Sequence, residues 1–205
     1  MDSVKERLEV ELLKTYYQTS RENLSSRLRL RDQAIYLLFL VSSIVFCASL
    51  LKSDGYSGRP LLIIPFVSMA AALSVNYQNE YIARIVHYLG NDIQEELIRR
   101  KVDLTEWSYA RGHLDLHKNE WLGSDRAAAE LYFLLTPAVM ALILSFSDFQ
   151  TQLTNLLALN RLNEIDHITL WGWIVGLIQI ILIAVTNHKV NKFKADIYAS
   201  LPGRN

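Results

Sequence analysis

Residues 77–130 combine cations, histidines and aromatic rings, which are side chains that together can bind a nucleotide. Cations bind phosphates and aromatic faces stack on bases, so the mixture suits a nucleotide or a short oligonucleotide. Tyr81, Arg84 and Tyr88 have helical spacing and form the best single cluster. The predicted ligand-binding residues are Tyr81, Arg84, Tyr88, Arg99, Arg100 and Arg111.

The same segment has a second interpretation, as a solvated helical subdomain with a small aromatic core. It carries 7 of the 21 Lys and Arg residues but 10 of the 21 Asp and Glu residues. This acidic balance is typical of a solvated helical surface and does not by itself favour an anionic ligand. The sequence leaves both interpretations open.

His113 and His117 lie four residues apart, and Glu120 follows one turn later. On a helix the two imidazoles could share a metal ion, with Glu120 as a third ligand, or all three could lie on an exposed helix surface. The glutamate that directly follows the first histidine in zincin proteases is missing. No nucleophile elbow or phosphate-binding glycine loop is present. We therefore predict no enzyme activity, no catalytic residue and no cofactor, and a metal-dependent hydrolase is only the third hypothesis.

A second set of residues recurs at intervals of 4, 3, 4 and 3 in an uncharged segment near the C-terminus. The predicted pore-lining residues are Gly172, Gly176, Gln179, Ile183 and Thr186. Glycines four residues apart let two helices approach closely. An amide in hydrocarbon needs a hydrogen-bond partner or water, so Gln179 either contacts a neighbouring helix or lines an aqueous path between subunits.

Four long segments of the chain contain no Asp, Glu, Lys or Arg, namely residues 33–51, 60–79, 131–147 and 167–188. A helix needs roughly 17–25 residues to cross a bilayer, so each segment is long enough, and residues 131–147 are the least secure. The first and last are apolar almost all round, as expected of helices in lipid. The sequence predicts an all-α polytopic membrane protein with four transmembrane helices in two hairpins.

Helical periodicity continues beyond the first two uncharged segments. Residues 4–30 form a predicted amphipathic helix that runs straight into the first span, because neither Gly nor Pro interrupts residues 8–44. Residues 77–89 continue the second span until Gly90. The predicted regions are an N-terminal helix (1–32), a transmembrane hairpin (33–76), a helical insert (77–130), a second hairpin (131–188) and a tail (189–205).

Three further features are predicted near the second hairpin. Pro137 is expected to kink the third span, since proline releases a helical carbonyl. Residues 153–162 are expected to form a surface helix before the fourth span. Trp171 and Trp173 are expected to anchor the start of that span at the membrane interface.

Lys and Arg residues are distributed unevenly, with 18 in the two ends and the insert and three in the connections within the hairpins. The positive-inside rule therefore predicts that both termini and the insert are cytoplasmic. Arg27, Arg29 and Arg31 are expected to contact membrane lipid phosphates, or else a specific anion. The absence of charge within the spans argues against a proton relay, a voltage sensor or an ion-coupled transporter.

The plan of the chain and the run Asn79-Glu80-Tyr81-Ile82-Ala83-Arg84-Ile85-Val86-His87-Tyr88 resemble the small four-span effectors of bacterial antiphage defence, of the Hailong and CBASS types. The resemblance implies an inner-membrane, homo-oligomeric channel that depolarises the cell. It also implies gating by a nucleotide that a partner enzyme synthesises. We take a tetramer as the working subunit number. The alternative is a non-conducting membrane scaffold that recruits a cytoplasmic protein.

Overall fold

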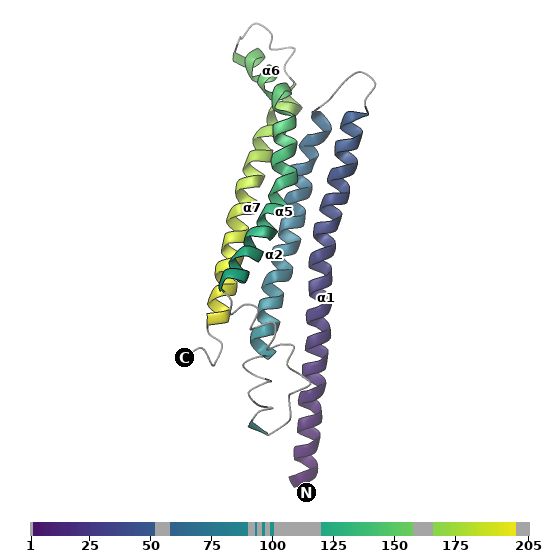
Figure 1. Ribbon diagram of the computed structural model, residues 1–205, viewed down its shortest axis with the longest axis vertical. Coiled ribbons are helices and arrows are strands. Elements are labelled where there is room, and N and C mark those ends of the chain that lie inside the picture. The colour runs from purple at the N-terminus through teal and green to yellow at the C-terminus, as the bar shows by residue number, and fades with distance from the viewer. Residues whose placement is uncertain are drawn as a thin grey trace. The chain divides into compact units, whose positions relative to one another are not determined.

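The structure, a computed structural model, describes residues 2–51, 58–89, 93, 96, 99–100, 120–157 and 166–199. Its elements are α1 (Asp2–Leu50), a 3-10 helix η1 (Arg59–Ile63), α2 (Ile64–Tyr88), α5 (Glu120–Leu144), α6 (Phe146–Leu157) and α7 (His167–Ala199). None of the described residues is in a β-strand, so the predicted all-helical class is confirmed for them (Figure 1).

Three helical segments are long and apolar enough to cross a membrane, namely Arg7–Leu50, Arg59–Tyr88 and His167–Ile197. A fourth exists only if α5 and α6 count as one span, because they meet at a bend of 52°. The chain therefore has three or four candidate spans, and the uncertain one contains the shortest of the uncharged segments.

Two predicted helix continuities are confirmed. α1 includes both the amphipathic N-terminal segment and the first uncharged segment, and α2 continues to Tyr88, past the end of the second. The reason lies in the sequence, since neither Gly nor Pro occurs between residues 1 and 54 or between residues 66 and 89. α7 likewise extends beyond its uncharged segment to Ala199.

The chain divides into two compact units. Unit 1 comprises Met1–Asp32, Asn76–Ala127 and Lys189–Asn205, and unit 2 comprises Gln33–Val75 and Ala128–His188. Unit 1 contains 18 of the 21 Lys and Arg residues and unit 2 contains three. The division therefore falls where the charge of the sequence changes, and α1, α2 and α7 each contribute residues to both units.

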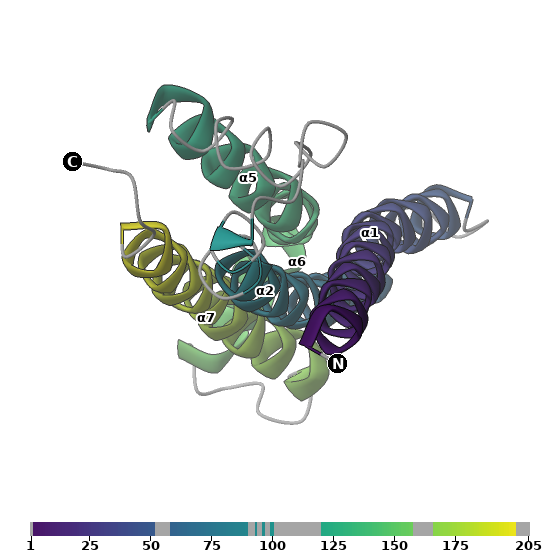
Figure 2. The same ribbon diagram turned by 90° about the horizontal axis from the view of Figure 1, so that it is seen from below.

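The main core of unit 2 draws on all four long helices. Its buried members are Leu38, Ala71, Ala72, Val75, Leu134 and Ile183. Leu61, Ile64 and Ala141 form a second cluster near the start of α2. Figure 2, a view from below, shows α2 with α1 on one side and α7 on the other. Small residues on α2 allow this close packing.

The change of direction between α5 and α6 occurs at Ser145. Ser145 Oγ accepts a hydrogen bond of 3.0 Å from Trp173 Nε1, and the Phe149 ring stacks on Trp173 with centroids 4.6 Å apart. These contacts hold α6 against α7. α5 runs through Pro137 as a single helix, so the proline at which we predicted a kink does not end the helix.

The remaining predictions for this end of unit 2 have mixed outcomes. α6 begins at Phe146, seven residues before the predicted surface helix, and ends at Leu157, while residues 158–162 lie outside the described residues. Trp171 is exposed, as a membrane-interface residue would be. Trp173 is instead engaged within the protein by Phe149 and Ser145.

Unit 1 is held together by contacts between the first half of α1 and the last part of α2. Leu24 packs with Ile82 and Val86. Tyr17 packs with Leu89 and Ile93. This apolar seam leaves the other faces of the two helices available for polar contacts.

Candidate functional site

The predicted Tyr81, Arg84 and Tyr88 cluster lies on one exposed face of α2. Tyr81 is 37% exposed, Tyr88 is 44% exposed and the side chain of Arg84 is 64% exposed. Their spacing of three and four residues places them side by side along the helix. The residues on the opposite side of α2, including Ile82 and Val86, pack against α1. The cluster is therefore open to solvent in the way that a ligand site requires.

Arg27 of α1 joins this cluster. Its guanidinium carbon lies 4.4 Å from the centroid of the Tyr81 ring, a cation–π distance, and its Nη1 donates a hydrogen bond of 3.3 Å to Gln78 Oε1. The Tyr77 ring lies beside Tyr81 with centroids 6.3 Å apart. Sequence reasoning predicted that Arg27 contacts lipid phosphates or a specific anion, and it missed the contact with Tyr81, because nothing local connects residues 54 positions apart.

Arg84 has two partners of its own. It forms an ion pair of 2.5 Å with Glu80, one turn earlier on α2, and its guanidinium carbon lies 5.7 Å from the centroid of the Phe193 ring on α7. An exposed pair of this kind contributes little to stability. The guanidinium can therefore exchange Glu80 for a stronger anion at small cost.

Arg99 and Arg100 are engaged differently. Both form ion pairs with Glu96, and Arg100 Nη1 also lies 2.8 Å from Glu9 Oε2 on α1. Hydrogen bonds from Arg99 and Arg100 lower the pKa of Glu96, and those with Glu96 and Glu9 raise the pKa of Arg100. An anionic ligand would have to displace two carboxylates from Arg100. The ligand role of both arginines stays a prediction.

Several predicted site residues cannot be placed. Arg111, His113 and His117 lie outside the described residues, and Glu120 is described only as the first residue of α5. The fourth arginine of the predicted ligand site, Arg111, and the alternative metal site therefore stay predictions.

The predicted pore-lining face of α7 packs largely within unit 2. A Cβ atom on Gly172 would lie 2.8 Å from Leu62 Cδ1, and one on Gly176 would lie 3.1 Å from Leu142 Cδ2. Ile183 is fully buried in the main core. Close helix packing therefore accounts for both glycines.

Gln179 and Thr186 complete this face. Gln179 Oε1 is buried and has no hydrogen-bond partner among the described residues. Thr186 Oγ1 donates a hydrogen bond of 2.8 Å to the carbonyl of Leu182, one turn earlier. The pore-lining role of this face stays a prediction.

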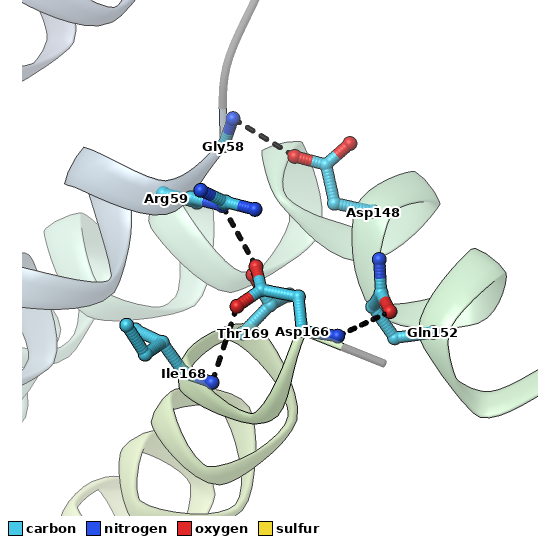
Figure 3. Close-up of polar contacts among 7 residues, drawn as sticks. All are labelled: Gly58, Arg59, Asp148, Gln152, Asp166, Ile168 and Thr169. Carbon is cyan, nitrogen blue, oxygen red and sulfur yellow. Dashed lines mark hydrogen bonds and ion pairs between the residues drawn. The ribbon is translucent and has the colours of Figure 1, made fainter. Parts of the chain in front are cut away.

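A polar network that sequence reasoning missed joins distant segments of unit 2 (Figure 3). Arg59 Nε lies 2.7 Å from Asp166 Oδ2, although the residues are 107 positions apart. The Asp166 amide donates a hydrogen bond of 2.8 Å to Gln152 Oε1, and the Gly58 amide donates one of 2.9 Å to Asp148 Oδ2. The network thus connects the start of η1 with α6 and the start of α7.

Asp166 is also the N-cap of α7. Its Oδ1 accepts a hydrogen bond of 3.2 Å from the Ile168 amide, and its Oδ2 accepts one of 2.5 Å from Thr169 Oγ1 (Figure 3). Burial disfavours the charged carboxylate, but Thr169 and the Arg59 guanidinium outweigh it, so the pKa of Asp166 is lowered. An aspartate just before a long apolar segment was the sequence feature that could have revealed this cap.

Comparison with known protein families, with curated proteins and with solved structures finds no match to this chain.

Proposed function

We propose that this chain is one subunit of a homo-oligomeric channel in the bacterial inner membrane, which collapses the membrane potential under control of a nucleotide-type ligand. In this proposal the chain crosses the membrane four times, with both termini and unit 1 in the cytoplasm. The observation that carries the proposal is the continuity of α2 from Ile64 to Tyr88. Its first part lies in the core of unit 2 and its last part carries the exposed cluster.

The ligand chemistry follows from the four side chains of the cluster. Arg27 and Arg84 supply guanidinium groups on two different helices, which suit phosphate oxygens. Arg27 occupies one face of the Tyr81 ring, so a base would stack more readily on the exposed ring of Tyr88. A nucleotide phosphate would replace Glu80 as the partner of Arg84.

Gating would follow from the continuation of α1 and α2 from unit 1 into unit 2. A phosphate held by Arg27 of α1 and Arg84 of α2 would change how these helices pack in unit 1. Both helices continue into unit 2, so a change in their packing could bias the membrane segments between two arrangements. A synthesising partner enzyme would set the ligand concentration.

Conduction in this proposal requires several subunits, because four helices packed around a common core leave little room for a route of their own. The exposed apolar side chains of the spans would contact lipid or neighbouring subunits. Gln179 is the amide assigned to the route.

Ligand control is tested by titrating purified protein with nucleotides and short oligonucleotides. We expect binding at micromolar concentration, weakened at least tenfold in Arg84→Ala and in Arg27→Ala. Arg29→Ala is the matched control, since Arg29 is exposed on α1 but faces away from Arg27 by its spacing of two residues. Equal affinity in all four proteins would remove the proposed site.

Conduction is tested with a membrane-potential dye in cells that express the protein together with its ligand source. We expect the potential to collapse, and Gln179→Leu to reduce ion flux in a correctly assembled oligomer. Undiminished flux in that variant would exclude Gln179 from the route. The role in antiphage defence rests on the resemblance and is tested by plaque counts on cells with and without the gene.

The alternative function, a non-conducting scaffold, is favoured by one observation. Leu8, Leu12 and Tyr16 of α1 are exposed and recur every four residues, so they form an apolar stripe on a charged segment. Such a stripe can pack against a helix of another protein. A scaffold would leave the membrane potential unchanged, and replacing the stripe with polar residues would abolish partner recruitment.

A further inference from the structure

Four polar side chains in unit 2 have buried oxygen atoms that lack hydrogen-bond partners among the described residues. Asn187 lies at the end of unit 2, and the other three are Ser42 of α1, Ser68 of α2 and Gln179 of α7. Ser42 is 3% exposed and Ser68 is 0% exposed. A buried polar group without a partner is costly, so such groups in proteins usually bind water or another ligand.

The two serines also differ from other hydroxyl groups of unit 2. Ser49, Thr136 and Thr186 each donate a hydrogen bond to the carbonyl four residues earlier, at 2.9, 2.7 and 2.8 Å. This local bond is the usual way to satisfy a hydroxyl group within an apolar helix. Ser42 and Ser68 do not make it, so their buried hydroxyl groups need a partner from outside their own helix.

Contacts between α2 and α7 place Ser68 and Gln179 at the same level, that is, at the same height along the two helix axes. Gly172 lies next to Leu62, and Gly176 lies next to Pro65. The two helices therefore run in the same direction, and residues that face each other differ by 110 or 111 in residue number. The same offset of 111 separates Ala72 from Ile183, which share the main core. It also separates Ser68 from Gln179.

α1 runs in the opposite direction and brings Ser42 to this level. Val45 and Phe46 pack with Leu61 and Ile64. Leu38 shares its cluster with Ala71 and Ala72. Position 42 lies halfway between these contacts and therefore faces the turn of α2 that holds Ser68.

α5 adds a fourth oxygen. Pro137 is buried midway between Leu134, which shares a cluster with Ala72, and Ala141, which shares one with Ile64. Proline has no amide hydrogen, so the carbonyl of Phe133 loses its usual helical donor at this level. Four helices thus each carry, at this level of unit 2, an oxygen atom that lacks its usual hydrogen-bond partner.

We propose that Ser42, Ser68, Gln179 and the Phe133 carbonyl surround a buried water site at the centre of unit 2. Every one of these groups is neutral, and an ion in so apolar a setting would need a compensating charge. Water needs two to four polar partners, and this level offers that number. Water is therefore the ligand that the chemistry of the site selects.

This site deepens the proposed function, on which its role in conduction rests. A hydrated layer halfway along the membrane segments is where a permeating ion could keep part of its hydration shell. In the assembled oligomer, the same hydrated layer would lie beside the route between subunits to which Gln179 is assigned. The presence of water itself does not depend on conduction.

The direct test is a high-resolution structure of the full chain in lipid nanodiscs. We expect density for at least one water molecule within hydrogen-bond distance of two or more of Ser42, Ser68 and Gln179. Direct bonds between these side chains with no such density, or an empty site, would overturn the proposal.

Matched alanine variants provide a second readout through the unfolding midpoint in nanodiscs. Ser42→Ala and Ser68→Ala each remove a contact to the water, so we expect the midpoint to fall by roughly 2–4 °C. Ser43→Ala and Ser74→Ala are the controls, because both serines are exposed on the same helices, and they should leave it unchanged. A rise of the midpoint in Ser42→Ala and Ser68→Ala would show dry, unpaired hydroxyl groups and contradict the proposal.

The two proposals fail separately. A chain that holds the water but carries no ion flux would support the water site and contradict the channel. A chain that conducts but lacks the water would support the channel and overturn this inference.

Discussion

The Arg59 and Asp166 network of unit 2 and the Tyr81, Arg84 and Tyr88 cluster of unit 1 use their polar residues in opposite ways. The Asp166 side chain is only 12% exposed and joins residues that are up to 107 positions apart, whereas Arg84 is 64% exposed and pairs with Glu80 only one turn away. Contacts between distant residues restrict how the helices pack, and a local exposed pair does not. The comparison indicates that the Arg59 and Asp166 network holds the fold, while the Tyr81, Arg84 and Tyr88 cluster is free to bind.

The largest effect is expected from adding bulk where α7 meets the start of α2. Gly172→Val places side-chain atoms within 3 Å of Leu62 Cδ1, and such overpacking costs about 1–3 kcal/mol. We expect a lower unfolding midpoint and less assembled oligomer, measured by thermal unfolding and size-exclusion chromatography. Ser74→Val places the same side chain at an exposed position of α2 and is the control. An unchanged unfolding midpoint in Gly172→Val would contradict close packing of α7 against Leu62.

Removal of Asp166 is the next largest perturbation. Asp166→Ala loses the N-cap of α7 together with the contact to Arg59, and loss of a cap alone costs about 0.5–2 kcal/mol. Asp166→Asn keeps an N-capping side chain and loses only the charge, so its loss should be smaller. Chemical unfolding of both variants measures the difference. Equal losses would assign the whole effect to the ion pair.

Acid should weaken unit 2 through the same carboxylate. The pKa of Asp166 is lowered in the folded protein, so its charge contributes stability that is fully present above its unfolded value, near 3.8. That contribution is lost as the pH falls through the lower folded value. The difference in unfolding free energy between wild type and Asp166→Asn should therefore be constant at neutral pH and vanish in strong acid. A difference that persists there would contradict the role of the charge.

A smaller effect is expected in unit 1 from Arg100→Ala, which removes the ion pairs with Glu96 and Glu9. We expect a fall in the unfolding midpoint that is smaller than that of Asp166→Ala and that shrinks as salt is added. Arg99→Ala removes a pair within the same segment only and is the comparison variant. A loss that is insensitive to salt would show that the Arg100 stem, and not its charge, matters.

The smallest effect on stability is expected from Arg84→Ala. The side chain is exposed, so the change should stay within about 0.5 kcal/mol while ligand binding falls. Thermal unfolding without ligand provides the measurement. A loss as large as that of Asp166→Ala would remove the contrast between the two regions and make the cluster structural.

Parts of the candidate sites were predictable because they depend on spacing within one helix. Tyr81, Arg84 and Tyr88 share a face of α2 because α-helical geometry places residues three and four apart together. Arg27 could not be added to that cluster, since its contact with Tyr81 depends on how α1 packs against α2. Asp166 could not be predicted as the partner of Arg59 for the same reason, since their contact depends on how distant segments pack.

The glycines of α7 show what a local sequence pattern can predict and what it cannot. Their spacing predicted close helix contact without naming the neighbour, and the structure supplies Leu62 for Gly172 and Leu142 for Gly176. Gln179 was expected to need a partner, yet its buried oxygen has none among the described residues. Only the positions of Ser42 and Ser68 on neighbouring helices point to water as that partner.

The sequence by itself determined the helical class, the uncharged segments and the continuation of α1 and α2 beyond them. These properties follow from hydrophobicity, charge and the absence of Gly and Pro, which act over a few turns of chain. The tertiary structure alone decided the bend at Ser145, the Arg59 and Asp166 network and the burial of Ser42 and Ser68. Those features depend on contacts between helices far apart in the chain, which no local pattern encodes.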